Sequence, residues 1–174
     1  MLFRSRANLF EGAICAITPT SQSPPKLVTK LDELWKSVGA QPLRLSPELH
    51  DDLVGRSSHL PHVVAAELAN YVLSPVHPKE QGMLCANGFR DTTRIASGSP
   101  EMWRDIALAN REPLAGAIGA FIGELQQLQR AIAAGDAAAL EVFYHTAKQR
   151  RDAWRSPSAS SSPEIGRASC RERV

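Results

Sequence analysis

The sequence predicts a mainly α-helical protein in which a short strand–helix–strand unit precedes a long helical region. Only residues 13–45 contain short apolar runs of the β type. A serine, a proline and a glutamate then stand together at residues 46–48 and again at residues 99–101, an order typical of a helix start. Between residues 114 and 132, apolar side chains recur at the helical spacings of three and four. We therefore expect only helices and loops after residue 46.

Residues 13–45 are predicted to form one strand–helix–strand repeat. The apolar run at residues 13–18 ends at Pro19, as expected of a buried strand, and residues 41–45 form the second strand. Gly39 lies just beyond the helix between them. One repeat is too small to bury a sheet by itself, so we interpret it as the last piece of a larger domain. The apolar face of this helix consists of Leu27, Leu31, Leu34, Trp35 and Val38.

A long helical pattern covers residues 46–73 and contains a proline. Pro61 removes a backbone donor and clashes with the preceding turn, so we predict a kink or break near residues 57–61. Such a bend can turn His59 and His62 toward a cleft. The polar, glycine-containing segment at residues 82–98 is expected to be a substrate-binding loop.

The helical region is predicted to end with two further amphipathic helices. The first has an apolar seam suited to lengthwise packing on another helix. Three glycines on the same helix destabilise it unless a neighbouring backbone approaches closely. Gly135 is predicted to end this helix and Asp136 to cap the last one. The seam consists of Leu114, Ile118, Phe121, Leu125, Leu128 and Ile132, and the glycines are Gly116, Gly119 and Gly123.

Composition and charge argue against several classes of protein. The 174 residues include 20 Lys and Arg against 18 Asp and Glu, a net charge of +2, so we expect no nucleic-acid partner. No apolar run approaches the roughly 18 residues that span a bilayer, so no membrane partner is expected. Residues 1–17 make a poor signal peptide, and we expect a cytoplasmic protein. The three cysteines lack metal-ligand spacing.

The last residues have the composition of a tail. Residues 156–163 are rich in serine and proline and have nothing to bury, which predicts disorder. Residues 164–174 look like the translation of a sequencing-library adapter, with an ordinary basic tail as the alternative. We therefore exclude residues 156–174 from the predicted fold.

The first candidate site is the segment SHLPH at residues 58–62. His59 and His62 are three apart and would share a helical face, where they have three interpretations. The two histidines can be metal ligands, structural histidines whose ring nitrogens are hydrogen-bonded within the protein, or a polar pair that lines an anion-binding pocket. A metal site needs further ligands that the spacing of the other histidines does not supply, so we predict no metal. No glycine-rich dinucleotide fingerprint occurs in the sequence.

The second candidate site lies within residues 87–103. Arg90 and Arg94 are four apart, and Asp91 can orient either of them. A guanidinium binds a carboxylate through two parallel hydrogen bonds, which suits a small dianionic substrate. A solvated charged turn is the alternative, but nearby Trp103 favours a site that excludes water.

The motifs together resemble a known enzyme family. SHLPH at residues 58–62, GFRDTTRIAS at residues 88–97 and PEMWRDI at residues 100–106 are similar, in this order and separation, to prephenate and arogenate dehydrogenases of tyrosine biosynthesis. The resemblance covers residues 9–154. It implies a helical dimerisation domain of the prephenate dehydrogenase type, preceded by a βαβ remnant of a Rossmann-like domain.

The resemblance also implies an activity and roles for residues. The family oxidatively decarboxylates prephenate to 4-hydroxyphenylpyruvate with NAD or NADP. Arg94 would bind the ring carboxylate and His62 would face the substrate side chain, with His59 beside it. Arg90 and Asp91 would lie at the pocket entrance. Trp103 completes the predicted substrate-binding set.

The family's catalytic histidine and its cofactor-binding turn belong to a region upstream of these motifs. The resemblance therefore implies no catalytic, cofactor-binding or metal-binding residue in this chain, and a fragment that is inactive alone. The implied domains are residues 1–46, the end of the dinucleotide-binding domain, residues 47–155, the helical substrate-binding and dimerisation domain, and the tail at residues 156–174. A homodimer is expected.

Two other interpretations stay open at this point. The chain is a non-catalytic helical dimerisation or ligand-sensing module, or it belongs to another hydroxyacid dehydrogenase with a similar helical domain. The residues do not distinguish prephenate from arogenate or NAD from NADP, and feedback by tyrosine is also open.

Overall fold

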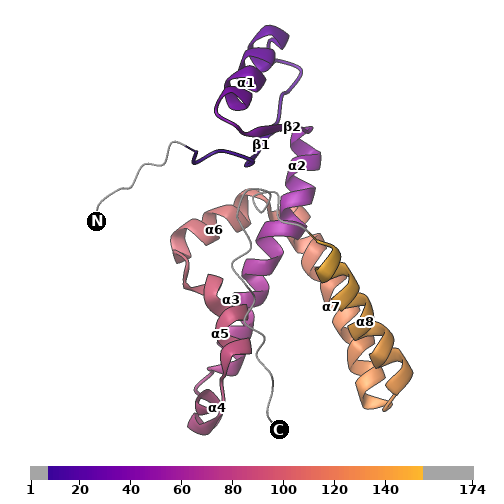
Figure 1. Ribbon diagram of the computed structural model, residues 1–174. Coiled ribbons are helices and arrows are strands. Elements are labelled where there is room, and N and C mark those ends of the chain that lie inside the picture. Colours follow the sequence, from indigo (N-terminus) through magenta and orange to yellow (C-terminus); the bar gives the residue numbers. More distant parts are fainter. Residues whose placement is uncertain (1–7, 155–174) are drawn as a thin grey trace. The chain divides into compact units, whose positions relative to one another are not determined.

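The computed structural model describes residues 8–154, and Figure 1 shows its elements. The described residues divide into two compact units. One contains residues 8–45 and 141–154, and the other contains residues 46–140. The predicted tail at residues 156–174 lies outside the described residues. The domain limits themselves stay a prediction.

Residues 8–45 form the strand–helix–strand repeat. Strand β1 (Ile14–Ile17) pairs in parallel with β2 (Gln41–Arg44), and helix α1 (Pro25–Ser37) connects them. Gly39 makes the turn into β2 with a φ of +85°, and a Cβ added there would lie 3.1 Å from the Cα of Glu11. Only glycine combines this backbone conformation with this close approach.

The second unit begins with one continuous helical stretch. Helix α2 (Pro47–Val54) passes into η1, a π-helical segment (Gly55–His59), and then into α3 (Leu60–Val72). The predicted kink is a π-helical turn that keeps the helix unbroken. Pro61 lies in the first turn of α3, and the wider turn before it makes a bond from the Leu60 N–H to the Gly55 carbonyl.

The segment predicted as a substrate-binding loop is largely helical. It contains the end of α4 (Lys79–Met83), α5 (Asn87–Thr93) and the 3₁₀ helix η2 (Arg94–Ser97). The prediction of a loop is wrong here, because α5 and η2 pack against α3, and tertiary packing outweighs weak local propensity.

The start of α6, the end of α7 and the start of α8 lie at the predicted signals. Ser99 caps α6 (Pro100–Ala109), and its Oγ accepts a hydrogen bond from the Met102 N–H. Helix α7 (Arg111–Ala133) is followed by Gly135 at a φ of +64° and by α8 (Ala137–Ala153), which Asp136 caps. The predicted fold class, mainly helical after a βαβ unit, is confirmed.

The predicted close neighbour of the α7 glycines is not present in the described part of the chain. Within residues 8–154, no atom outside the helix's own backbone lies within 4 Å of a Cβ built on Gly116, Gly119 or Gly123. Leu114 and Ala117, near the start of the same helix, are buried in the core of this unit. Within the described residues, the glycine face of α7 is therefore open.

Candidate functional site

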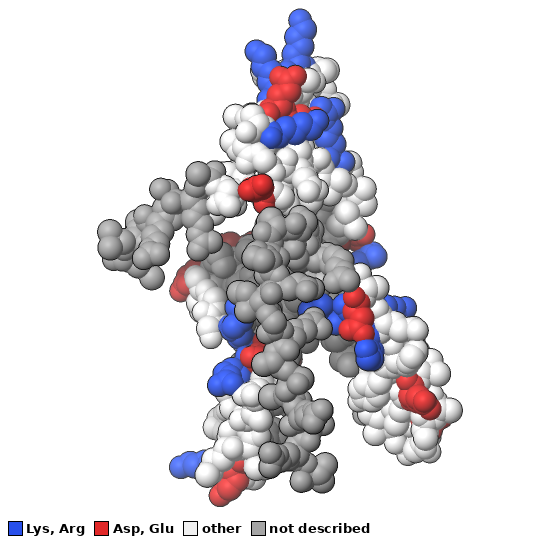
Figure 2. Space-filling view, viewed as in Figure 1, with Lys and Arg blue, Asp and Glu red and all other residues white. Residues whose placement is uncertain are grey.

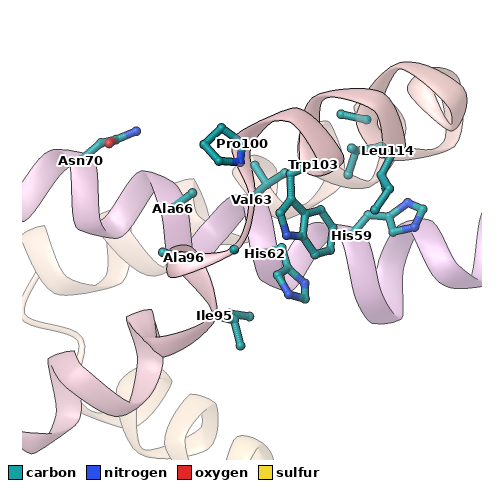
Figure 3. Close-up of a pocket in the computed structure, with 13 residues that line it drawn as sticks. His59, His62, Val63, Ala66, Asn70, Ile95, Ala96, Pro100, Trp103 and Leu114 are labelled. Atoms are coloured by element: carbon teal, nitrogen blue, oxygen red, sulfur yellow. The ribbon is translucent and has the colours of Figure 1, made fainter. Parts of the chain in front are cut away.

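The second unit contains a cavity of about 350 Å³. The cavity is lined by η1, α3, η2, α6 and the start of α7, and Figure 3 shows the side chains around it. Most of the lining is apolar, with two imidazoles and one indole as its polar rings. The lining residues are His59, His62, Val63, Ala66, Asn70, Ile95, Ala96, Gly98, Pro100, Trp103, Ile106, Ala107 and Leu114.

His62 and Trp103 form one wall of the cavity. Their rings stack with centroids 3.7 Å apart and planes inclined by 26°, and Figure 3 shows the imidazole beneath the indole. The Nδ1 atom of His62 lies 3.0 Å from the carbonyl oxygen of Ser58. A carbonyl only accepts hydrogen bonds, so Nδ1 carries the proton. In the neutral ring, Nε2 is then an acceptor.

His59 lies at the other side of the indole. Its ring meets Trp103 edge-on with centroids 6.4 Å apart, and its Nδ1 lies 3.0 Å from Nδ2 of Asn110. Burial lowers the pKa of His59 below its ordinary value of 6.5. Asp51 opposes this shift in the pKa, while His50 adds to it. The imidazole of His59 is therefore neutral near pH 7.

Trp103 is held by the turn that precedes α6. A Cβ added to Gly98 would lie 2.6 Å from the indole Nε1 and 2.9 Å from Cδ1. The indole therefore rests directly against the Gly98 backbone, where no larger residue fits without displacing it.

The predicted charged residues lie beside the cavity wall and are not among its lining residues. Arg94 is exposed and is the first residue of η2, directly before Ile95, which lines the cavity. Arg90 is exposed on α5, and its guanidinium contacts the side chain of Asn87. Asp91 is also exposed on α5. The structure thus brings His59, His62 and Trp103 together, and the two arginines lie on the adjoining α5–η2 segment.

One polar contact at the site was not predicted from the sequence: Asn110 is a buried polar side chain that contacts His59. Gly98, the last residue of the segment predicted to bind substrate, lines the cavity. For Asn110 the only signal in the sequence is its position before the acidic and proline residues that start α7. That signal predicts a helix cap, whereas its side chain bonds elsewhere.

The turn after β1 does not fit a dinucleotide. Pyrophosphate binding uses backbone N–H groups at the first turn of a helix after a glycine-rich loop. Here Pro24 and Pro25 stand at the start of α1, and proline has no N–H.

Among residues 8–154, no three His, Cys, Asp or Glu side chains gather as metal ligands. None of the helices in this range is long and apolar enough to cross a membrane.

A protein-family model matches residues 46–146, more than half of the chain, and is described as the dimerization domain of prephenate dehydrogenase. The chain belongs to this family. The resemblance seen in the sequence motifs is therefore confirmed, and the matched range contains every residue of the cavity.

Relatives of the prephenate dehydrogenase family match a wider part of the chain. Prephenate dehydrogenase of Bacillus subtilis is 37% identical over 149 residues, which cover 83% of this chain and 39% of the relative. The Aquifex aeolicus prephenate dehydrogenase, solved with hydroxyphenyl propionate and NAD+, has a TM-score of 0.76 and 35% identity. Synechocystis arogenate dehydrogenase has a TM-score of 0.76 and 28% identity. Each structural match covers 83% of this chain, and 51% and 53% of those chains, respectively. The chain thus spans about half or less of these relatives.

Proposed function

We propose that this chain forms the substrate-binding and dimerisation half of an enzyme that oxidatively decarboxylates prephenate or arogenate in tyrosine biosynthesis. In the overall reaction the ring hydroxyl loses its proton, a hydride passes to the nicotinamide, and the ring carboxylate leaves as CO2. The observation that carries the proposal is the cavity lined by His59, His62 and Trp103, which lies inside the family-matched residues 46–146.

In this proposal the charged and polar side chains bind the two anionic ends of the substrate. Arg94 binds the ring carboxylate through the paired hydrogen bonds of its guanidinium. His62 faces the substrate side chain, and His59 lies beside it. The entrance is formed by Arg90 and Asp91.

The apolar wall of the cavity has its own role. Trp103, Ile95 and Val63 exclude water from the ring, which strengthens the charge interactions around it. We assign the deprotonation of the ring hydroxyl to none of the described histidines, because none matches the position of the family's catalytic histidine.

The cofactor of the proposed reaction is NAD, as in the Aquifex aeolicus complex, with NADP as the alternative. The turn after β1 does not fit the pyrophosphate, so we assign no described residue to the cofactor.

We further propose that helix α7 joins two copies of the chain in a homodimer. Between residues 114 and 129 its only charged residue is Glu124. Ile122, Leu125 and Ile132 are each about half exposed. In Figure 2 much of the surface in the region that Figure 1 labels α7 is uncharged. An exposed apolar face of this kind is typical of a protein interface.

The two other functions carry less support. A non-catalytic dimerisation or sensing module is not favoured, because the relatives named above are dehydrogenases. Another hydroxyacid dehydrogenase is distinguished by its substrate in the experiment below.

A chimeric enzyme tests the proposal. Residues 46–154 of this chain replace the matching part of the Bacillus subtilis enzyme, and NADH formation is followed with prephenate, arogenate and small hydroxyacids. We expect the chimera to oxidise prephenate or arogenate and none of the small hydroxyacids. A chimera that elutes as a folded dimer but turns over neither, or that prefers a small hydroxyacid, would overturn the proposal. The parent enzyme is the control for the assay.

A further inference from the structure

Asn110 connects the cavity histidine to the backbone across the π-helical segment. Its side chain is buried, with 6% of the residue exposed. The amide Nδ2 lies 2.8 Å from the backbone oxygen of Asp51 and 3.0 Å from Nδ1 of His59. Both contacts therefore use the same nitrogen, which has two hydrogens to donate.

The Asp51 carbonyl fixes which way this amide faces. A carbonyl oxygen only accepts, so the atom facing it must be Nδ2, and the reversed amide would set two oxygens against each other. Nδ2 then donates its second hydrogen toward Nδ1 of His59. That ring nitrogen must be the unprotonated one, which leaves the proton of the neutral imidazole on Nε2.

The two cavity histidines consequently carry their protons on different nitrogens. The Nδ1 of His62 donates to the Ser58 carbonyl, so its Nε2 is an acceptor in the neutral ring. His59 accepts at Nδ1 and has its N–H at Nε2. The cavity therefore offers a ligand one imidazole donor and one imidazole acceptor.

We propose that Asn110 is a positioning residue that holds His59 as the neutral imidazole protonated on Nε2, so that His59 presents an N–H donor to an anionic group bound in the cavity. The identity of that group as a substrate carboxylate rests on the proposed function. The positioning itself rests on the Asn110 contacts alone.

The surroundings of Asn110 favour this role. A Cβ added to Gly55 would lie 3.4 Å from Nδ2 of Asn110, so the glycine of the π-helical segment leaves room for the amide. A protonated His59 would set its Nδ1 hydrogen against an Nδ2 hydrogen. Burial is the main cause that lowers the pKa of His59; the nearby His50 and His62 lower it further, and Asp51 raises it.

The tautomer is measurable on the full 174-residue chain. With ¹⁵N-labelled histidine, long-range proton–nitrogen correlation spectra near pH 7.5 distinguish a protonated from an unprotonated ring nitrogen. The His59→Gln variant identifies the His59 signals. We expect the proton on Nε2 for His59 and on Nδ1 for His62. A wild-type His59 protonated on Nδ1 would overturn the proposal without any variant.

Variants of Asn110 then test the cause. In Asn110→Ala the His59 signals are expected to move toward a mixture of both tautomers. In Asn110→Asp the carboxylate accepts a hydrogen bond from a protonated Nδ1, which reverses the tautomer preference and raises the pKa of His59. Gln127→Ala, an exposed amide on α7, is the matched control and should leave the spectrum unchanged. A His59 tautomer unaffected in both Asn110 variants would contradict the positioning role.

A ligand probe separates this inference from the proposed function. Adding 3-(4-hydroxyphenyl)propionate should shift the Nε2 resonance of His59 in the wild type, and the shift should be lost or reduced at least about twofold in Asn110→Ala. A shift at His62 with none at His59 would refute the donor role. If neither histidine responds to the ligand, both the donor role of His59 and the proposed substrate binding are wrong. The tautomer measurement still tests separately whether Asn110 positions His59.

Discussion

The indole of Trp103 stacks on the imidazole of His62, with ring centroids 3.7 Å apart. The two residues belong to α6 and α3, so this contact holds two helices together at the wall of the cavity. A stacked aromatic pair contributes roughly 0.5–1.5 kcal/mol beyond its buried area. Displacing the indole therefore changes both the stability of the unit and the shape of its cavity.

Gly98→Ala is predicted to displace the indole. The backbone φ of Gly98 is −70°, which alanine adopts freely, so the cost comes from the 2.6 Å approach of the new Cβ to Nε1 of Trp103. Overpacking of this kind costs about 1–3 kcal/mol in the free energy of unfolding, measured by urea denaturation followed by circular dichroism. Near-ultraviolet circular dichroism reports the changed indole. Gly88→Ala is the control, since no neighbour in the described part of the chain lies within 4 Å of a Cβ added there. Equal effects of both changes would contradict the prediction.

Ser99→Ala is predicted to destabilise the start of α6. The Ser99 Oγ accepts the Met102 N–H at 3.3 Å, and removing such a cap costs about 1 kcal/mol in the free energy of unfolding. Urea denaturation of the full chain measures the loss. Ser97→Ala, an exposed serine just before the cap, should have less than half of this effect. Equal free energies of unfolding for Ser99→Ala and Ser97→Ala would show that the Ser99 cap does not stabilise α6.

Local signals in the sequence were sufficient to predict several helix limits. Ser46 and Ser99 followed by proline, and Gly135 followed by Asp136, mark helix ends through short-range hydrogen bonds and backbone conformation. These signals depend on a few neighbouring residues, so a single sequence contains them in full. The motif around His59 and His62 likewise predicted two rings that the structure places in one cavity.

The rest of the site depends on contacts between distant residues. The Asn110 amide reaches Asp51 and His59, both more than fifty positions earlier in the chain, and no local pattern indicates such a bond. The helical conformation of residues 87–97 likewise follows from packing on α3. The π-helical segment that begins at Gly55 was predicted only as a kink or break near residues 57–61, because Pro61 indicates an irregular turn but not its type.

The stability of the chain is predicted to fall in weak acid through His59. Burial lowers the pKa of His59 in the folded state below 6.5, its ordinary value in the unfolded state. Between the folded-state pKa and 6.5, the unfolded state therefore binds more protons than the folded state. The contribution of neutral His59 to the free energy of unfolding is fully present above pH 6.5 and decreases as the pH falls toward the folded-state pKa. Urea denaturation at about pH 7.5 and about pH 5.5 measures this loss. It should be smaller in His59→Gln than in the wild type and unchanged in His145→Gln, an exposed histidine of α8. A loss of the same size in all three proteins would contradict the assignment to His59.

Leu125→Glu is predicted to weaken the proposed dimer. Leu125 is 47% exposed on the apolar face of α7 that also contains Ile122 and Ile132, where a second copy would bury it. A buried carboxylate without a partner is costly. The dimer dissociation constant, measured by sedimentation or light scattering over a range of concentrations, should rise at least about tenfold. Gln127→Glu adds the same charge at an exposed position of the helix and serves as the control. A dissociation constant that does not change in Leu125→Glu would exclude this face from the dimer interface.

Arg94→Ala in the chimeric enzyme is predicted to raise the KM for prephenate. The guanidinium is exposed at the start of η2, beside the cavity-lining Ile95, and in our proposal it pairs with the ring carboxylate. A hydrogen bond to a charged group contributes about 1.5–3 kcal/mol, so the KM should rise by roughly one to two orders of magnitude. Arg94→Lys should recover only part of this, because an ammonium group cannot form the two parallel bonds of a guanidinium. Arg111→Ala removes another exposed arginine of the same unit and should leave the KM unchanged. An unchanged KM in Arg94→Ala would remove Arg94 from the substrate site and leave the histidines and Trp103 as its binding residues.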